Sequence, residues 1–256
     1  MNQRKKIAPT LIILLCLSAL APLALAAGAA APGLSADEAL KLLQDGNCRF
    51  MEGRAIHPHQ DAARRALTFG QGQHPFAAVL SCSDSRVPVE VIFDQGIGDL
   101  FVVRVAGNVA ATDELGSMEY AVEHLGTPLV AVLGHSQCGA VTAVVEGAKL
   151  PGNLGPLLAP IKPAVSQARE ENPGAAGEAL IAAAIRDNVF QAMEDVLRKS
   201  PVIKAKVKAG KVKLMGAIYE LDTGKVQWLG SHPDQEKLLA GKAPVKAGKK
   251  GKKPEE

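Results

Sequence analysis

Two short segments carry side chains that could bind a metal ion. They are residues 81–86 (SCSDSR) and 134–139 (GHSQCG). Cys82, His135 and Cys138 would offer two thiolates and one imidazole, a ligand set that suits Zn²⁺. Three protein ligands leave a fourth position open, which is typical of catalytic zinc sites, where a bound water loses its proton near pH 7.

Asp84 and Arg86 place a carboxylate and a guanidinium just after the first cysteine. They can pair as a bidentate fork, which would lower the pKa of Asp84 and keep it able to accept a proton or a hydrogen bond. The alternative for this pair is an ordinary structural salt bridge.

The cysteines also have a structural interpretation. Cys82 and Cys138 could form a disulfide, with His135 as a hydrogen-bonded residue at a strand end. A thiol–disulfide oxidoreductase is disfavoured because the chain has no Cys-x-x-Cys motif. Cys48 is expected to be a small buried residue with no further role.

The elements that must position these segments alternate along the chain. Continuous apolar runs predict buried strands, hydrophobic periodicity predicts helices, and Asp222-Thr223-Gly224 predicts the turn of a closing hairpin. The expected strands are 76–81, 99–105, 128–133, 212–218 and 225–229, and the expected helices are 35–51, 114–125, 138–148 and 180–197. The turn-rich stretch 53–75 is interpreted as a connection.

This order predicts an α/β fold with a mostly parallel central β-sheet flanked by helices and an N-terminal helical arm. The arm helix has a capping-box pattern at Ser35 and Glu38. Because ligand crevices lie outside the carboxyl ends of parallel strands, Cys82, His135 and Cys138 are expected to meet there.

The net charge of +3 combines +3 from residues 1–26, +4 from residues 241–256 and −4 from residues 27–240. Residues 1–26 combine a basic start, an apolar run and Ala24-Leu25-Ala26, so we expect a signal peptide cleaved after Ala26 and an exported, periplasmic or secreted protein. An uncleaved membrane anchor is the alternative. Residues 241–256 predict a Lys-rich disordered tail. The enzyme domain is expected at 27–240 and is acidic, which argues against a nucleic-acid partner.

Four motifs in order resemble the β-class carbonic anhydrases. They are CSDSR at 82–86, FVVRVAGN at 101–108, EYAV at 119–122 and GHSQCG at 134–139, and the similarity extends over about 36–230. The resemblance implies a β-carbonic anhydrase-like fold, a homodimer or higher homo-oligomer with active sites at the subunit interface, and reversible hydration of CO2 to bicarbonate and a proton by zinc-bound hydroxide. Separately, removal of the signal peptide would leave no stable membrane insertion.

The resemblance assigns roles to single residues. Cys82, His135 and Cys138 would bind one Zn²⁺ per subunit. Asp84 would hydrogen-bond the zinc water or, in a closed form, become the fourth ligand, and Arg86 would hold Asp84 away from the metal.

Substrate binding involves a second group of residues in the family. Gln73 would hydrogen-bond the substrate, Phe101 and Tyr120 would line an apolar pocket, and the Gly139 N–H would lie near the zinc-bound oxygen. Ala106 stands where some members carry Val, which slightly enlarges the pocket. On pattern alone, Phe101 and Tyr120 are ordinary packing residues.

Alternative activities remain open at this stage. They are hydrolysis of carbonyl sulfide or carbon disulfide, and non-catalytic binding of zinc or bicarbonate. His74, next to Gln73, is the candidate proton shuttle outside the two motif loops.

Overall fold

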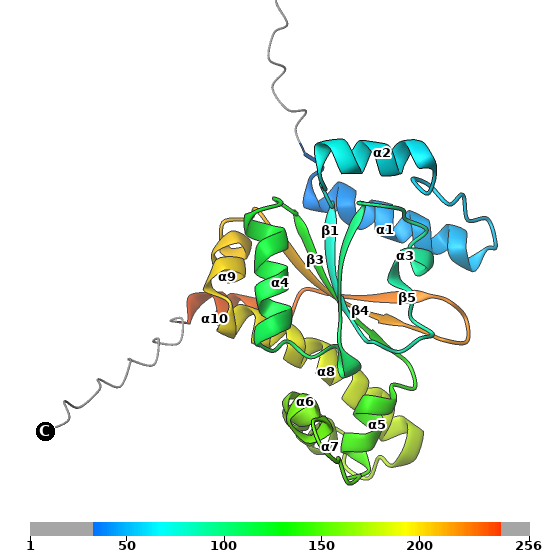
Figure 1. Ribbon diagram of the computed structural model, residues 1–256. Helices are drawn as coiled ribbons and strands as arrows, with labels where there is room; N and C mark the ends of the chain where they lie inside the picture. The colour runs from blue at the N-terminus through cyan, green and yellow to red at the C-terminus, as the bar shows by residue number, and fades with distance from the viewer. Residues whose placement is uncertain (1–32, 242–256) are drawn as a thin grey trace, which may run out of the picture. The chain divides into compact units, whose positions relative to one another are not determined.

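The computed structural model describes residues 33–241, and a five-stranded sheet lies at its centre (Figure 1). The signal peptide expected at 1–26 and, apart from Gly241, the tail expected at 241–256 lie outside the described residues. The strand order is β2-β1-β3-β4-β5, with the first four strands parallel and β5 antiparallel to β4. The strands are β1 (Ala77–Ser81), β2 (Leu100–Arg104), β3 (Leu129–His135), β4 (Lys213–Tyr219) and β5 (Val226–Gly230). The predicted mostly parallel α/β fold and its closing hairpin are therefore confirmed.

Helices cover both faces of the sheet (Figure 1). They are α1 (Ala36–Met51), α2 (Ala62–Gln71), α3 (Val89–Ile92), α4 (Thr112–Glu123), α5 (Gly139–Val145), α6 (Leu154–Leu158), α7 (Lys162–Glu171), α8 (Gly177–Lys199), α9 (Pro201–Lys208) and α10 (Gln235–Ala240), with 3₁₀ turns η1 (Ala106–Asn108) and η2 (Ala159–Ile161). Between residues 33 and 241, no helix has the length and apolarity that crossing a bilayer requires.

Alternate strand residues face opposite cores, as the two-residue period of a strand requires. Ala78 and Leu80 of β1 pack into the core that includes residues of α4, α5, α8 and α9. Ala77 and Val79 pack into the core that includes residues of α1 and α3. Both faces of β1 are buried, which is why its sequence is a continuous apolar run.

The N-terminal arm is docked on the chain's own sheet. The predicted capping box is present, since the Ser35 side chain accepts from the Glu38 N–H and Glu38 accepts from the Ser35 N–H. Further along α1, the buried Asn47 side chain donates to the carbonyl oxygens of Ile92 and Gly224. These bonds join the arm to α3 and to the β4–β5 turn.

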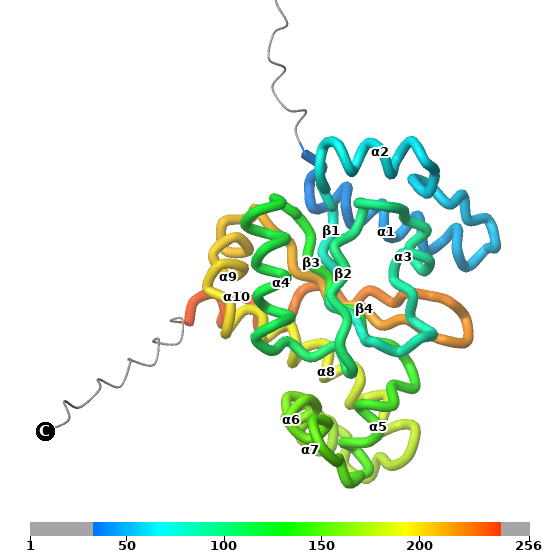
Figure 2. Tube along the Cα trace, in the orientation of Figure 1, coloured from blue at the N-terminus to red at the C-terminus, as the bar shows by residue number. Residues whose placement is uncertain are grey.

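The prediction that 53–75 is only a connection is wrong, because it contains α2. Figure 2 follows the chain from α1 through a long turn into α2 and then along β1. Asp61 caps this helix by accepting from the Arg64 N–H at 2.7 Å. None of its residues is buried. The signals of this helix, the Asp61 cap and apolar residues at helical spacing (Ala63, Ala66 and Leu67), were overlooked among the turn residues that flank it. The expectation for Cys48 is also wrong, because this residue of α1 is exposed.

Candidate metal centre

The three candidate ligands come from two neighbouring parallel strands. Cys82 directly follows β1, His135 is the last residue of β3, and Cys138 immediately precedes α5. Strands β1 and β3 pair in parallel register, so both end at the same edge of the sheet. The sulfur atoms of the two cysteines and a ring nitrogen of His135 all lie within 4.8 Å of one another. The expected juxtaposition is present, and the three side chains are buried.

The loop between the two C-terminal ligands is tightly held. Gln137 has a φ of 53°, which turns the chain sharply enough to bring Cys138 back toward His135. The Ser136 N–H donates to the Tyr219 carbonyl at 2.9 Å, and the Ser136 hydroxyl accepts from the Leu221 N–H at 2.9 Å. These bonds anchor the loop to the end of β4.

The imidazole of His135 is prepared for a metal. Its Nδ1 lies 2.8 Å from the Ser136 carbonyl oxygen, and since a carbonyl only accepts, Nδ1 carries the hydrogen. Nε2 is therefore free to act as a ligand, and within the described part of the chain it is buried without a hydrogen-bond partner. A buried polar atom of this kind is costly unless something binds it. The donor set and this orphaned nitrogen together fit a zinc ion.

The two thiols are free, and each shifts the pKa of the other in the opposite direction. The Cys138 thiol and the Gly107 N–H, which lies 3.3 Å from the Cys82 sulfur, lower the pKa of Cys82 despite its burial. The same contact raises the pKa of Cys138, because its proton lies against the Cys82 thiolate. The pair thus holds a thiolate ready for a cation, and binding would release the remaining proton.

Asp84 lies beside the cluster but is paired with Arg86. The Arg86 side chain donates from Nε to Oδ1 at 2.9 Å and from Nη2 to Oδ2 at 2.7 Å, and its backbone N–H donates to Oδ1 at 2.9 Å. This fork holds the pKa of Asp84 well below its usual range. Asp84 Oδ2 is 3.9 Å from His135 Nε2, so the carboxylate borders the position that a fourth ligand would take.

The expected substrate-binding residues do not all gather at this centre. Ala106 begins η1 next to the Gly107 N–H, and Gly139 begins α5 next to Cys138. Gln73 instead precedes β1, at the end of the strand opposite Cys82, and is exposed. Phe101 lies level with Ala78, well before the carboxyl edge, and packs on the half-exposed Tyr120 with ring centroids 6.2 Å apart.

Comparison with known proteins identifies the family. The family model described as "Carbonic anhydrase" matches residues 77–226. Carbonic anhydrase 2 of Mycobacterium tuberculosis is 37% identical over 198 residues, which cover 76% of this chain and 93% of that protein. The chain belongs to the carbonic anhydrase family. A carbonic anhydrase of Mycolicibacterium smegmatis is 39% identical over the same shares of both chains.

Solved structures place this carbonic anhydrase in the β class. The β-carbonic anhydrase CcaA matches with a TM-score of 0.58 and 30% identity, covering 75% of this chain and 91% of that one. The β-carbonic anhydrase CafA of Aspergillus fumigatus matches with a TM-score of 0.62 and 29% identity, covering 68% and 84%. The resemblance drawn from the four motifs is therefore confirmed.

Two positioning residues of the carbonic anhydrase site were missed from sequence. Arg104, at the end of β2, donates from Nε to the Cys82 carbonyl at 3.0 Å and from Nη2 to the Asp84 carbonyl at 2.6 Å. Gly107 has a φ of 76°, and a Cβ there would lie 2.7 Å from the Ile161 side chain. Both residues lie in the FVVRVAGN motif at 101–108, but the sequence analysis assigned a role in that motif only to Phe101 and Ala106.

Proposed function

We propose that this carbonic anhydrase hydrates CO2 reversibly to bicarbonate and a proton at one zinc ion per subunit, held by Cys82, His135 and Cys138. The proposal rests on the three buried ligand atoms within 4.8 Å of one another, one of them the orphaned His135 Nε2. When bound, zinc would supply a hydroxide nucleophile at neutral pH by lowering the pKa of water to about 7.

In this proposal Asp84 acts as a hydrogen-bond acceptor beside the metal, and Arg86 keeps it ionised. The Asp84 carboxylate is an acceptor, because three donors from Arg86 keep it ionised. Its Oδ2 atom lies 3.9 Å from His135 Nε2, where it would accept a hydrogen bond from the oxygen that attacks CO2 and so orient it. Arg104 holds the backbone on both sides of the Cys82–Asp84 turn and so fixes this geometry.

A second copy of the chain completes the site in this proposal. Gln73 and Tyr120 are exposed, and the position of Gln73 at the opposite end of β1 keeps it away from its own Cys82. If Gln73 binds substrate as the family resemblance implies, we infer that it does so at the metal centre of another subunit. Homodimerisation along this side would bring Gln73, Phe101 and Tyr120 of one subunit to the centre of its partner, where they would bind CO2 and exclude water.

The test is a kinetic one on the chain beginning at Ala27. Zinc per chain is measured, and CO2 hydration is followed by stopped flow from about pH 6.5 to 9. Asp84→Asn is compared with Asp45→Asn, which alters a carboxylate paired with Lys41 on the exposed side of α1. We expect one zinc per chain, rapid hydration, a loss of about 10²-fold or more in Asp84→Asn, and no change in Asp45→Asn.

Two outcomes would overturn the proposal. Stoichiometric zinc without CO2 hydration would favour a sulfur-containing substrate or a zinc- or bicarbonate-binding protein. Absence of zinc together with a Cys82–Cys138 disulfide would contradict the metal centre itself.

We also propose that residues 1–26 direct export and are removed, leaving 27–240 as the enzyme domain in the periplasm or outside the cell. The support is the basic, apolar and small-residue pattern of the segment. Cell fractionation with an antibody to the purified domain tests this, and a chain retained in the cytoplasm with residues 1–26 attached would contradict it.

A further inference from the structure

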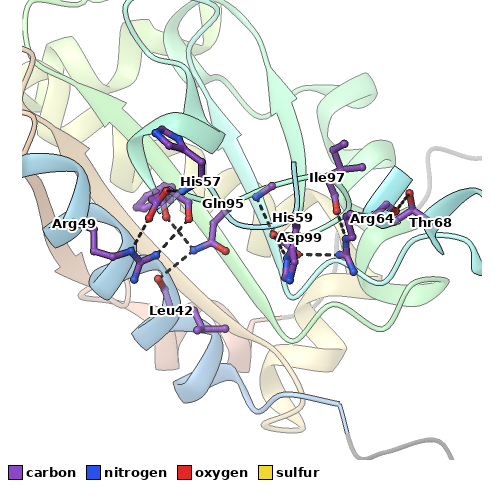
Figure 3. Close-up of polar contacts among 12 residues, drawn as sticks. Leu42, Arg49, His57, His59, Arg64, Thr68, Gln95, Ile97 and Asp99 are labelled. Carbon is purple, nitrogen blue, oxygen red and sulfur yellow. Dashed lines mark hydrogen bonds and ion pairs between the residues drawn. The ribbon is translucent and has the colours of Figure 1, made fainter. Parts of the chain in front are cut away.

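A buried carboxylate lies far from the metal ligands, at the turn before β2. The Asp99 side chain is only 6% exposed. His59 Nδ1 lies 2.8 Å from both of its oxygens, Arg64 Nη2 donates to Oδ1 at 3.0 Å, and the Gly96 N–H donates to Oδ2 at 2.8 Å. Figure 3 shows His59 and Arg64 converging on Asp99 from the segment that contains α2.

These polar contacts attach a helix that the core does not hold. Because α2 has no buried residue, apolar packing contributes little to its position. Arg64 also donates from Nε to the Ile97 carbonyl at 2.7 Å, and the Ile97 N–H donates to the His59 carbonyl at 3.0 Å. The attachment therefore forms one cluster, which we call the Asp99 clamp: His59, Arg64, Ile97 and Asp99.

Asp99 hydrogen-bonds to the chain both before and after Gln73. The side chain of Asp99 binds Arg64 in the first turn of α2. Its backbone carbonyl accepts the Phe76 N–H at 2.9 Å, just after Gln73 and before β1. One residue thus fixes the position of the first turn of α2 and of the residues that lead into β1.

The clamped helix presents apolar side chains to solvent. Phe69 of α2 is 94% exposed and Leu67 is 44% exposed. They lie in the same stretch as Gln73, and the adjoining β2 is the outermost strand on that side of the sheet. A second copy of this chain is the occupant that accounts for these features together, because the proposed function brings Gln73 to the metal centre of another subunit and because β2 leaves this edge of the sheet unpaired among the described residues.

We propose that Asp99 is a positioning residue that, through Arg64 and His59, presents α2 and Gln73 to the metal centre of a second copy of the chain. This inference rests on the proposed function, since it concerns how the two copies complete one site. Loss of the clamp would release α2 without unfolding the sheet. Displacement of a substrate-binding group by about 1 Å can cost about 10²-fold in rate.

Two adjacent arginines provide a matched test. Arg64→Ala removes both clamp bonds of that side chain, whereas Arg65→Ala removes an exposed arginine for which no side-chain partner occurs among residues 33–241. Asp99→Asn keeps the shape of the side chain and removes its charge. For each variant, sedimentation velocity gives the dimer dissociation constant, stopped flow gives kcat and KM, and zinc content and melting temperature report on the rest of the fold.

We expect Arg64→Ala and Asp99→Asn to keep one zinc per chain, to dimerise at least 10-fold more weakly, and to raise KM for CO2. Their activity per chain should rise with protein concentration, because mass action restores the dimer; a purely structural role would not produce this recovery. Arg65→Ala should match the wild type in every measurement.

The inference is overturned if Arg64→Ala dimerises and hydrates CO2 as the wild type does. It is also overturned if its activity falls without any dependence on protein concentration. A wild-type protein that dimerises but never hydrates CO2 would instead refute the proposed function, and the sedimentation shift of Arg64→Ala would still decide whether the clamp positions α2.

Discussion

Replacement of Arg86 by alanine separates chemistry from stability at the metal centre. The substitution removes two side-chain donors to Asp84 but leaves the backbone N–H that also binds it. The Arg86 side chain is 51% exposed, and pairs this open to solvent stabilise a fold by about 0.2–1 kcal/mol. For a domain of this size that corresponds to a fall in Tm of no more than about 2–4 °C.

The expected effect on activity is much larger. Without the fork, the Asp84 carboxylate is free to turn toward His135 Nε2, 3.9 Å away, and to occupy the position where the substrate oxygen should lie. Loss of a preorganised charged group typically costs about 10²–10³-fold in kcat. On one preparation, stopped flow near pH 7.5 measures the rate of CO2 hydration, calorimetry measures Tm, and zinc analysis measures the metal content.

The control is Arg54→Ala, which breaks an exposed pair with Glu52 and should leave hydration unchanged. Hydration by Arg86→Ala within about threefold of the wild type would refute the assigned role. A fall in Tm well above 4 °C would show that the pair is structural and that any loss of activity is secondary.

Three further perturbations test other parts of the fold. Burial and the nearby Glu171 raise the pKa of Asp187 to about 6, so the folded state binds this proton more tightly than the unfolded chain. The stability that this proton contributes is complete below about pH 4 and is lost as pH rises past 6. Urea unfolding should therefore show that Asp187→Asn raises the free energy of unfolding by up to about 3 kcal/mol at pH 8 and leaves it unchanged at pH 4. Gly46→Ala should destabilise the protein by more than about 2 kcal/mol, since its Cβ would overlap the Phe93 carbonyl oxygen. Gly70→Ala, which has open space around its Cβ, should instead stabilise the protein by about 0.5–1 kcal/mol. Equal melting temperatures of the two variants would contradict the docking of α1. Intact-mass analysis of the exported protein should show a chain that starts at Ala27, and a retained N-terminus would refute cleavage.

The metal centre was predictable because its ligands lie at the ends of buried strands. Apolar runs indicate such strands directly, and the parallel pairing of β1 and β3 then brings Cys82 to His135. The Asp84–Arg86 fork is equally local, since the two residues are separated by one position. The site could be read from sequence because its parts are fixed by short-range pattern and by one rule about sheet edges.

The position of α2 was not predictable for the opposite reason. Helix α2 has apolar residues at helical spacing but buries none of them, and it is held by Asp99, which is 35 and 40 residues away from Arg64 and His59. Arg104 is similar, because its role depends on the register that sets it beside Ser81. Contacts that depend on register or on distant polar partners leave no periodic signal in the sequence.

The most direct test of the central claim is a zinc titration of CO2 hydration. The chain from Ala27 is stripped with a chelator, zinc is added in steps, and the hydration rate is followed by stopped flow at each step. The rate should rise linearly and stop rising at one zinc per chain, with no rise in a Cys82→Ser, Cys138→Ser double variant. A rate that does not depend on bound zinc, or equal activation of the double variant, would contradict catalysis at this cluster.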